Sequence, residues 1–169
     1  MDIKFIKSEN LKTKPDQNAL GFGKYFSDYM FVREWDEGQG WHDARIQPYA
    51  PIMLDPASMV LHYAQETFEG MKAYKSPKNE ILLFRPEMNA RRMANSNERL
   101  CMAIFPEADF VQAVEELVKV EADWIPTAEG TSLYIRPFMF ATEASVGVHP
   151  SKKYTFVIVC SPVGAYYPE

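Results

Sequence analysis

A single arginine interrupts an otherwise apolar and aromatic stretch, "SLYIRPFMFAT", residues 132–142. A guanidinium in such a run is paired with an acid, exposed by strand alternation, or directed at an anionic ligand, because burying it alone is costly. Tyr134 lies two positions before Arg136, so both side chains share one face of a strand. Two interpretations of Arg136 stay open here: it helps to bind an anion, or it forms an ion pair with an acid such as Glu143.

A second group of cations lies in "LFRPEMNARRM", where Arg91 and Arg92 are adjacent. The planar fork of a guanidinium suits the oxygens of a phosphate. The competing interpretation is a solvated helix face whose arginines pair with Glu87 or Glu98. The aromatic residues near these cations also have two interpretations. They line a binding pocket, or they belong to the hydrophobic core, as aromatic residues on strands and helix faces usually do.

Several common catalytic and metal-binding motifs are missing from the sequence. It has no glycine-rich phosphate loop and no G-x-S-x-G nucleophile turn. His42, His62 and His149 lie far apart and lack cysteine or acidic companions at ligand spacing, so we expect no metal. Cys101 and Cys160 form no close pair, which favours free thiols in a reducing cytoplasm.

Length and composition are typical of one folded globular domain. The chain has 169 residues, of which 47% are apolar and 24% charged. A net charge of −5 argues against binding to nucleic acid, which requires a basic surface. The N-terminal residues lack the apolar core of a signal peptide, and no apolar run approaches the roughly 20 residues of a spanning helix, so we expect no membrane segment.

The elements that must position these residues can be read from periodicity and turn residues. The sequence predicts a hairpin over 25–49, a helix over 57–69 that Gly70 ends, a second hairpin over 71–86, and strands over 131–142 and 153–163. Helices are expected after Pro86 and over 106–124. Together these elements predict an α+β fold with a mainly antiparallel sheet and helices packed on one side. Residues 1–20 are expected to form a loose arm before a domain over 21–165.

The motifs "LHYAQETFEGMKAY", "LFRPEMNARRM" and "SLYIRP", with "FGKYFSDYMF", "SVGV" and "CSPVGAYYP", closely resemble the branched-chain amino-acid aminotransferases. These are fold-type IV enzymes that use pyridoxal 5′-phosphate. The resemblance extends from about Gly21 to the last residue. It implies that the chain is the smaller, N-terminal domain and that residues 166–169 begin the linker to a larger domain.

The resemblance also implies roles for individual residues. Arg92 matches an arginine that contacts the cofactor phosphate, with Arg91 as the adjacent alternative. Phe22, Tyr63 and Tyr134 match aromatics of the substrate pocket, and Arg136 matches a residue at the active-site edge. Val146 and Val148 lie in a loop that resembles one reaching the neighbouring active site of a homodimer. The Schiff-base lysine has no counterpart here, so no catalytic residue is expected in this chain, which alone should be inactive and bind the cofactor weakly or not at all.

These implications lead to three hypotheses about function. The first is the small domain of an aminotransferase that passes the amino group of leucine, isoleucine or valine to 2-oxoglutarate. The second is part of another fold-type IV enzyme, such as D-amino acid aminotransferase or aminodeoxychorismate lyase. The third is a non-catalytic module that dimerises, or that binds a small anion through its arginines.

Overall fold

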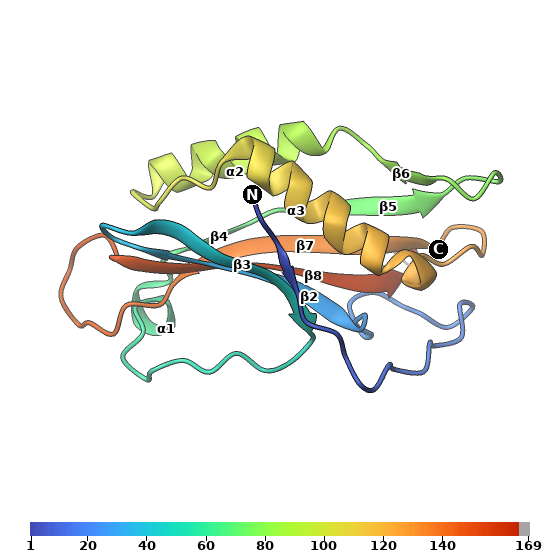
Figure 1. Cartoon of the computed structure of the whole chain (residues 1–169), viewed down its shortest axis with the longest axis horizontal. Helices are drawn as coiled ribbons and strands as arrows, with labels where there is room; N and C mark the ends of the chain where they lie inside the picture. Colours follow the sequence, from blue (N-terminus) through green and yellow to red (C-terminus); the bar gives the residue numbers. More distant parts are fainter. Residues whose placement is uncertain (166–169) are drawn as a thin grey trace.

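A twisted, mainly antiparallel sheet forms the centre of the structure, a computed structural model that describes residues 1–165 (Figure 1). Its strand order is β1-β3-β2-β8-β7-β5-β6, and β4 pairs with β7. The strands are β1 (Lys4–Phe5), β2 (Tyr29–Asp36), β3 (Gly40–Pro48), β4 (Glu66–Phe68), β5 (Met71–Lys75), β6 (Ile81–Leu83), β7 (Ser132–Ala141) and β8 (Lys153–Val163). The expected α+β architecture with a mainly antiparallel sheet is confirmed.

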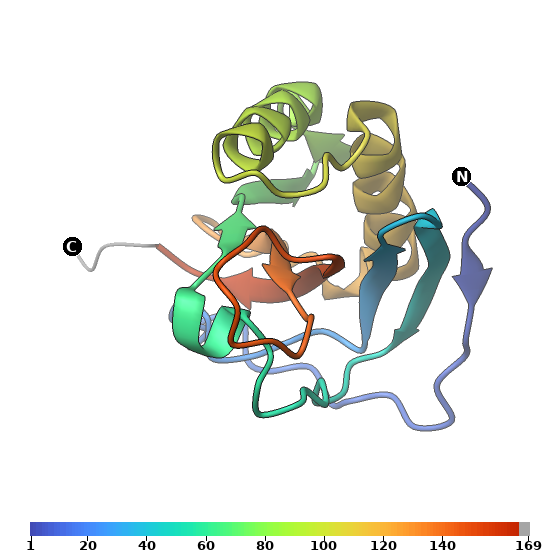
Figure 2. The same ribbon diagram turned by 90° about the vertical axis from the view of Figure 1, so that its left-hand side faces the viewer.

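Two long helices, α2 (Pro86–Arg99) and α3 (Glu107–Val120), cover one face of the sheet (Figure 2). Pro86 stands at the start of α2, where its missing N–H costs nothing. The buried face of α3 carries Phe110, Val114 and Leu117 at helical spacing. These side chains pack with inward-facing strand residues such as Ile135, and the main hydrophobic core therefore lies between this sheet face and the helices.

The predicted hairpins and long strands are present. Strands β2 and β3 pair in antiparallel fashion around the turn between residues 36 and 40, and β5 pairs with β6 in the same way. Strands β7 and β8 run beside each other over their full lengths, from Ser132 opposite Val163 to Ala141 opposite Tyr154. They lie at the centre of the sheet, where β8 also pairs with β2 and β7 also pairs with β4 and β5.

The predicted helix over 57–69 is wrong. Only α1 (Val60–Tyr63) is helical, and Ala64 ends it in a left-handed conformation. The following residues form β4, whose Thr67 lies opposite Met139 of β7. The helical spacing of apolar residues did not mark a buried face, since Phe68 is 65% exposed. Pairing with β7 satisfies the backbone of this segment and overrides its local helical pattern.

The N-terminal arm is partly ordered into the sheet, which differs from the expected loose segment. Strand β1 pairs in parallel with β3, so that Lys4 lies opposite Arg45. Its short ladder covers the otherwise unpaired edge of β3. The expected linker over 166–169 lies outside the described residues.

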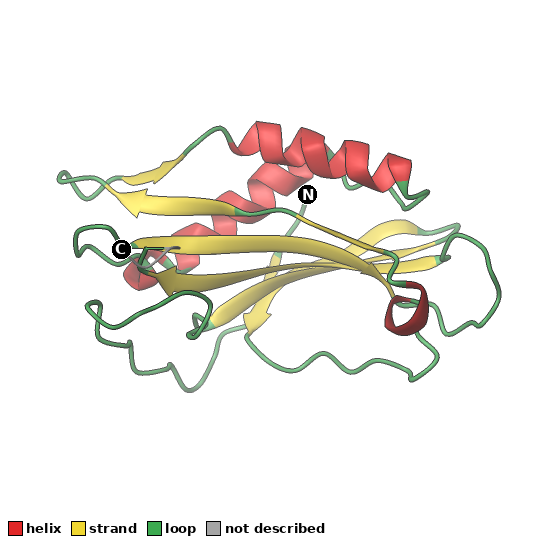
Figure 3. Ribbon diagram, turned by 180° about the vertical axis from the view of Figure 1, so that it is seen from behind, coloured by secondary structure: helices red, strands yellow, loops and turns green. Residues whose placement is uncertain are grey.

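The other face of the sheet, opposite α2 and α3, carries α1 and two long loops, which lie below the sheet in Figure 3. On β7, Tyr134 and Arg136 alternate with the buried Leu133 and Ile135, so they point to this helix-free face. Strands β4 and β5 lie end to end along the same side of β7, and the break between them faces Pro137. Proline lacks the N–H that a continuous ladder would need there.

No helix among the described residues is long and apolar enough to cross a lipid bilayer.

Candidate functional site

Tyr134 and Arg136 contact each other on the helix-free face of β7. The Nη2 of Arg136 donates a hydrogen bond of 2.7 Å to the hydroxyl of Tyr134. The guanidinium also lies 4.6 Å from the centre of the Phe68 ring, in cation–π geometry. Its Nε is buried without a hydrogen-bond partner among the described residues. No ion pair joins Arg136 to an acid within residues 1–165, so the alternative of a pair with Glu143 is not what the structure contains.

Gly70, at the break between β4 and β5, allows the close approach of Tyr134. A Cβ atom built on Gly70 overlaps the Tyr134 hydroxyl and lies 3.1 Å from its Cζ atom. Any larger residue at this position pushes the phenol away from the backbone. The hydroxyl that accepts from Arg136 therefore has its place because residue 70 lacks a side chain.

Glu69, between Phe68 and Gly70, points to the opposite side from Phe68 and meets α2. Its carboxylate accepts hydrogen bonds of 2.7 and 2.6 Å from the Nε and Nη2 of Arg92. Asn89, one turn earlier on α2, donates to the same carboxylate at 2.9 Å. The side chain of Glu69 is 3% exposed, whereas that of Arg92 is 68% exposed. Hydrogen bonding to Glu69 raises the pKa of Arg92, and its guanidinium stays charged at the surface.

The neighbouring Arg91 points elsewhere. Its Nε lies 3.8 Å from a carboxylate oxygen of Glu107 at the start of α3. Of the two adjacent arginines, Arg92 is thus the one attached to the segment that also carries Gly70 and Phe68. The interpretation of both arginines as a solvated face paired with Glu87 or Glu98 does not describe Arg92, whose acidic partner is the buried Glu69.

Phe22 joins the same cluster from the N-terminal part of the chain. Its ring packs edge-on against the ring of Tyr134, with 5.0 Å between the centroids. Phe22 and Phe68 thus provide apolar surface beside the polar pair of Tyr134 and Arg136. Arg136 therefore has aromatic rings next to it, whereas Arg92 is attached through Glu69 on the opposite side of the Phe68–Gly70 segment.

Tyr63, Val146 and Val148 form a separate group. The hydroxyl of Tyr63 donates to the backbone carbonyl of Val146 at 2.5 Å. This loop follows the far end of β7, roughly 20 Å along the strand from Tyr134 at the usual rise per residue. The valine side chains are 78% and 90% exposed. The structure therefore does not bring these residues into the cluster around Tyr134 of their own chain.

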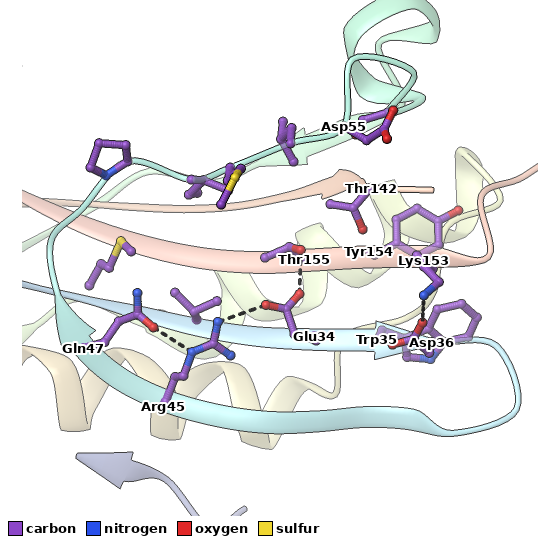
Figure 4. Close-up of a pocket in the computed structure, with 17 residues that line it drawn as sticks. Glu34, Trp35, Asp36, Arg45, Gln47, Asp55, Thr142, Lys153, Tyr154 and Thr155 are labelled. Atoms are coloured by element: carbon purple, nitrogen blue, oxygen red, sulfur yellow. Dashed lines mark hydrogen bonds and ion pairs between the residues drawn. The ribbon is translucent and has the colours of Figure 1, made fainter. Parts of the chain in front are cut away.

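A cavity of about 430 Å³ lies elsewhere on the same sheet face, under the loop after β3 (Figure 4). A polar network lines part of it: Glu34 accepts from Arg45 at 3.1 Å and from the hydroxyl of Thr155 at 2.6 Å. Arg45 also donates to Gln47 at 2.6 Å. These charged groups satisfy one another, so the network carries no free group for chemistry.

Sequence reasoning missed Phe68, Glu69, Gly70 and Asn89. The signal for the first three was the "FEG" tripeptide, in which an acid and a glycine interrupt a pattern of helical spacing. Asn89 had no local signal, because only the packing of α2 against β4 brings it to Glu69. The Phe68–Gly70 segment thus has a half-buried cation, Arg136, with an apolar wall on one side and an exposed, oriented cation, Arg92, on the other, and each guanidinium can bind an anionic group.

Curated proteins resemble the chain over nearly its whole length. Branched-chain-amino-acid transaminase 1 of Bacillus subtilis is 54% identical over 163 residues, which cover 96% of this chain and 46% of the relative. A probable branched-chain-amino-acid aminotransferase of Staphylococcus epidermidis is 52% identical over 165 residues, 98% of this chain and 46% of the relative. The chain thus spans a little under half the length of these relatives. No protein-family model matches it.

Solved structures resemble the fold. The branched-chain amino acid aminotransferase of Escherichia coli matches with a TM-score of 0.63 and 23% identity, over 83% of this chain and 41% of that one. A second branched-chain amino acid aminotransferase, solved with pyridoxamine 5′-phosphate, matches with a TM-score of 0.57 and 26% identity, over 81% of this chain and 41% of that one.

Proposed function

The chain is homologous to one segment of the branched-chain-amino-acid aminotransferases, and we propose that it forms the N-terminal, substrate-side domain of such an enzyme. The complete enzyme would transfer the amino group of leucine, isoleucine or valine to 2-oxoglutarate. The observation that carries this proposal is the cluster in which Gly70 seats Tyr134 beside Arg136 while the adjacent Glu69 holds Arg92.

Arg92 is the residue of this chain that would hold the phosphate of pyridoxal 5′-phosphate. Its guanidinium is exposed and its Nη1 makes no hydrogen bond within residues 1–165, so the donor set fits a phosphate. The structural relative at 26% identity was solved with the amino form of this cofactor, which supports the assignment. The chemistry that pyridoxal phosphate supplies when bound is the reversible capture of the substrate's amino group.

The substrate would lie between the aromatic rings and Arg136. Phe22 and Phe68 offer the apolar surface that a branched aliphatic side chain needs. Arg136 and the hydroxyl of Tyr134 offer donors for a carboxylate. Orientation of the substrate, rather than proton transfer, is the contribution that these groups can make.

The loop with Val146 and Val148 would act in a neighbouring subunit of a homodimer. Both valines are exposed, and Tyr63 fixes the loop from its own chain. Exposed apolar residues on a tethered loop suit a contact with another protein surface. Tyr63 would then support the pocket of the partner subunit rather than its own.

Proton transfer and covalent attachment of the cofactor would come from a larger domain that carries the Schiff-base lysine. We therefore expect this chain alone to be inactive and to bind pyridoxal phosphate weakly. Its cysteines, Cys101 and Cys160, are free thiols, which suits a reducing cytoplasm.

The other hypotheses have less support. The relatives at 52–54% identity are named as branched-chain enzymes. These names support the first hypothesis over another fold-type IV reaction and over a non-catalytic module. A module that only binds anions would also have no need for the aromatic wall beside Arg136.

A chimaera tests the proposal. The aligned segment of the Bacillus subtilis transaminase 1 is replaced by this chain, and transamination between leucine and 2-oxoglutarate is measured. We expect activity, and we expect Arg136→Leu in the chimaera to raise the KM for leucine at least tenfold. As a matched control, Arg45→Leu, outside the cluster, should leave the KM within twofold. A folded, cofactor-loaded chimaera without transamination would refute the proposal.

A further inference from the structure

Glu69 is an unusual partner for a surface arginine because it is almost completely buried. Its carboxylate, 3% exposed, receives charge-assisted hydrogen bonds from the Nε and Nη2 of Arg92 and a third bond from Asn89. The backbone around it is also fixed, since the N–H of Glu69 donates to the carbonyl of Pro137 at 2.8 Å. The acceptor is therefore rigid, while the cation that it binds extends toward solvent.

The atoms that Arg92 uses decide how its guanidinium is oriented. Nε and Nη2 form one edge of the planar group, and that edge faces Glu69. The adjacent edge consists of Nη1 and the second hydrogen of Nη2. This edge makes no hydrogen bond within residues 1–165 and is free to form a second two-donor fork to an oxyanion, in a different direction.

We propose that Glu69 is a positioning residue: it holds the Arg92 guanidinium by one edge so that the other edge presents a fixed fork to a phosphate group. The inference rests on the proposed role of Arg92 in phosphate binding. Asn89 assists, because its amide donates a further hydrogen bond to the Glu69 carboxylate at 2.9 Å and another to the carbonyl of Gly70 at 3.3 Å.

Two effects of Glu69 oppose each other. Its negative charge weakens the attraction of Arg92 for a phosphate, whereas its fork removes the rotational freedom that an unrestrained arginine would lose on binding. Both oxygens of the buried carboxylate accept hydrogen bonds from Arg92 or Asn89, so the guanidinium lies between the carboxylate and a phosphate bound to its free edge. We therefore expect orientation to outweigh repulsion.

The first experiment needs only the wild-type chain. Side-chain NMR of the arginines, with Arg92→Lys to assign the signals, reports whether the guanidinium rotates about its Nε–Cζ bond. We expect separate, slowly exchanging Nη signals for Arg92 without any phosphate. Rapid rotation of Arg92, as in an unrestrained arginine, would overturn the proposal.

The second experiment follows the Arg92 signals during a titration with inorganic phosphate at constant ionic strength. We expect Glu69→Gln to weaken phosphate binding at least threefold, although it removes a negative charge. Glu107→Gln, which removes the same charge next to Arg91, is the matched control and should change the affinity less than twofold. Equal or tighter binding by Glu69→Gln would overturn the proposal in favour of charge repulsion.

Asn89→Ala keeps the Arg92 fork and serves if Glu69→Gln does not fold. A loss of affinity smaller than that expected for Glu69→Gln supports the proposal, and unchanged affinity with unchanged rotation contradicts the assisting role of Asn89.

The two experiments together also separate this inference from the proposed function. Hindered rotation without any response to phosphate would refute the role of Arg92 in phosphate binding, whereas a phosphate response that Glu69→Gln leaves intact would refute only the role of Glu69.

Discussion

Replacing Gly70 by alanine should destabilise the protein through one atom, the hydroxyl oxygen of Tyr134. The added Cβ overlaps that oxygen, so the phenol or the backbone must move. Overpacking of this kind costs about 1–3 kcal/mol. The φ angle of Gly70 is not in the left-handed region, so alanine can adopt the same backbone conformation. Alanine also has fewer conformations than glycine in the unfolded chain, which offsets about 0.4–1 kcal/mol of the loss in stability. The expected net loss is about 1–2 kcal/mol.

A double-mutant cycle with Tyr134→Phe isolates this contact. Phenylalanine lacks the hydroxyl that the new methyl group meets, and only the tight contact to Cζ at 3.1 Å remains. In the Tyr134→Phe background, Gly70→Ala should therefore cost less than about 0.5 kcal/mol, which gives a coupling energy of about 0.5 kcal/mol or more. Tyr134→Phe by itself should cost about 1 kcal/mol, because it removes the acceptor for Arg136.

Urea denaturation of the four proteins, followed by tryptophan fluorescence and circular dichroism, measures these free energies of unfolding. Gly164→Ala is a matched control, because a Cβ at Gly164 meets its nearest atom, a backbone oxygen of Gly21, at 3.9 Å. Its effect should not depend on residue 134. Equal costs of Gly70→Ala in the two backgrounds would refute the argument that Gly70 exists to seat the Tyr134 hydroxyl.

Three further predictions concern other parts of the chain. Burial raises the pKa of Glu121 from 4.5 to about 7, so its contribution to stability is complete below pH 4.5 and is lost as the pH rises through 7. Glu121→Gln should keep an acceptor for the N–H of Tyr29. As the pH rises from 4.5 to 8, the free energy of unfolding of this variant should increase by about 3 kcal/mol relative to that of the wild type, as measured by urea titration. A difference that does not change with pH would contradict this. Asn97→Ala should cost about 1–3 kcal/mol, because it leaves the buried hydroxyl of Thr67 without its acceptor at 2.6 Å; a loss under 0.5 kcal/mol would show that this bond does not hold β4. Borohydride reduction of the chain with pyridoxal phosphate should label its lysines weakly and at scattered positions by mass spectrometry, and stoichiometric labelling of one lysine would overturn the inference that the cofactor lysine lies in another domain.

The sequence alone predicted most elements of the fold. Alternating apolar residues and polar turns identified the hairpin of β2 and β3, the long strands β7 and β8, and the helices α2 and α3. These patterns are local, because side chains on one strand or helix repeat with a fixed period. The failure over residues 57–69 has the opposite cause: a segment with helical spacing became a strand because β7 offered hydrogen-bonding partners that lie about 70 residues later in the chain.

The same distinction applies to the site. The sequence identified Arg136 as a charge in an apolar strand and placed Tyr134 on its face, since a period of two follows from strand geometry alone. It left open which of Arg91 and Arg92 matters, because neighbours on a helix differ by about 100° in direction and only packing decides which one meets a partner.

Tertiary structure decided the rest. It buried the carboxylate of Glu69 against α2 and brought Gly70 under the Tyr134 hydroxyl, contacts between residues about 20 and 64 positions apart. It also separated Tyr63 and the loop of Val146 from that cluster. Local periodicity fixes the direction in which a side chain points, but its partner depends on which elements the fold packs together, and that is settled by burial and hydrogen bonding over the whole chain.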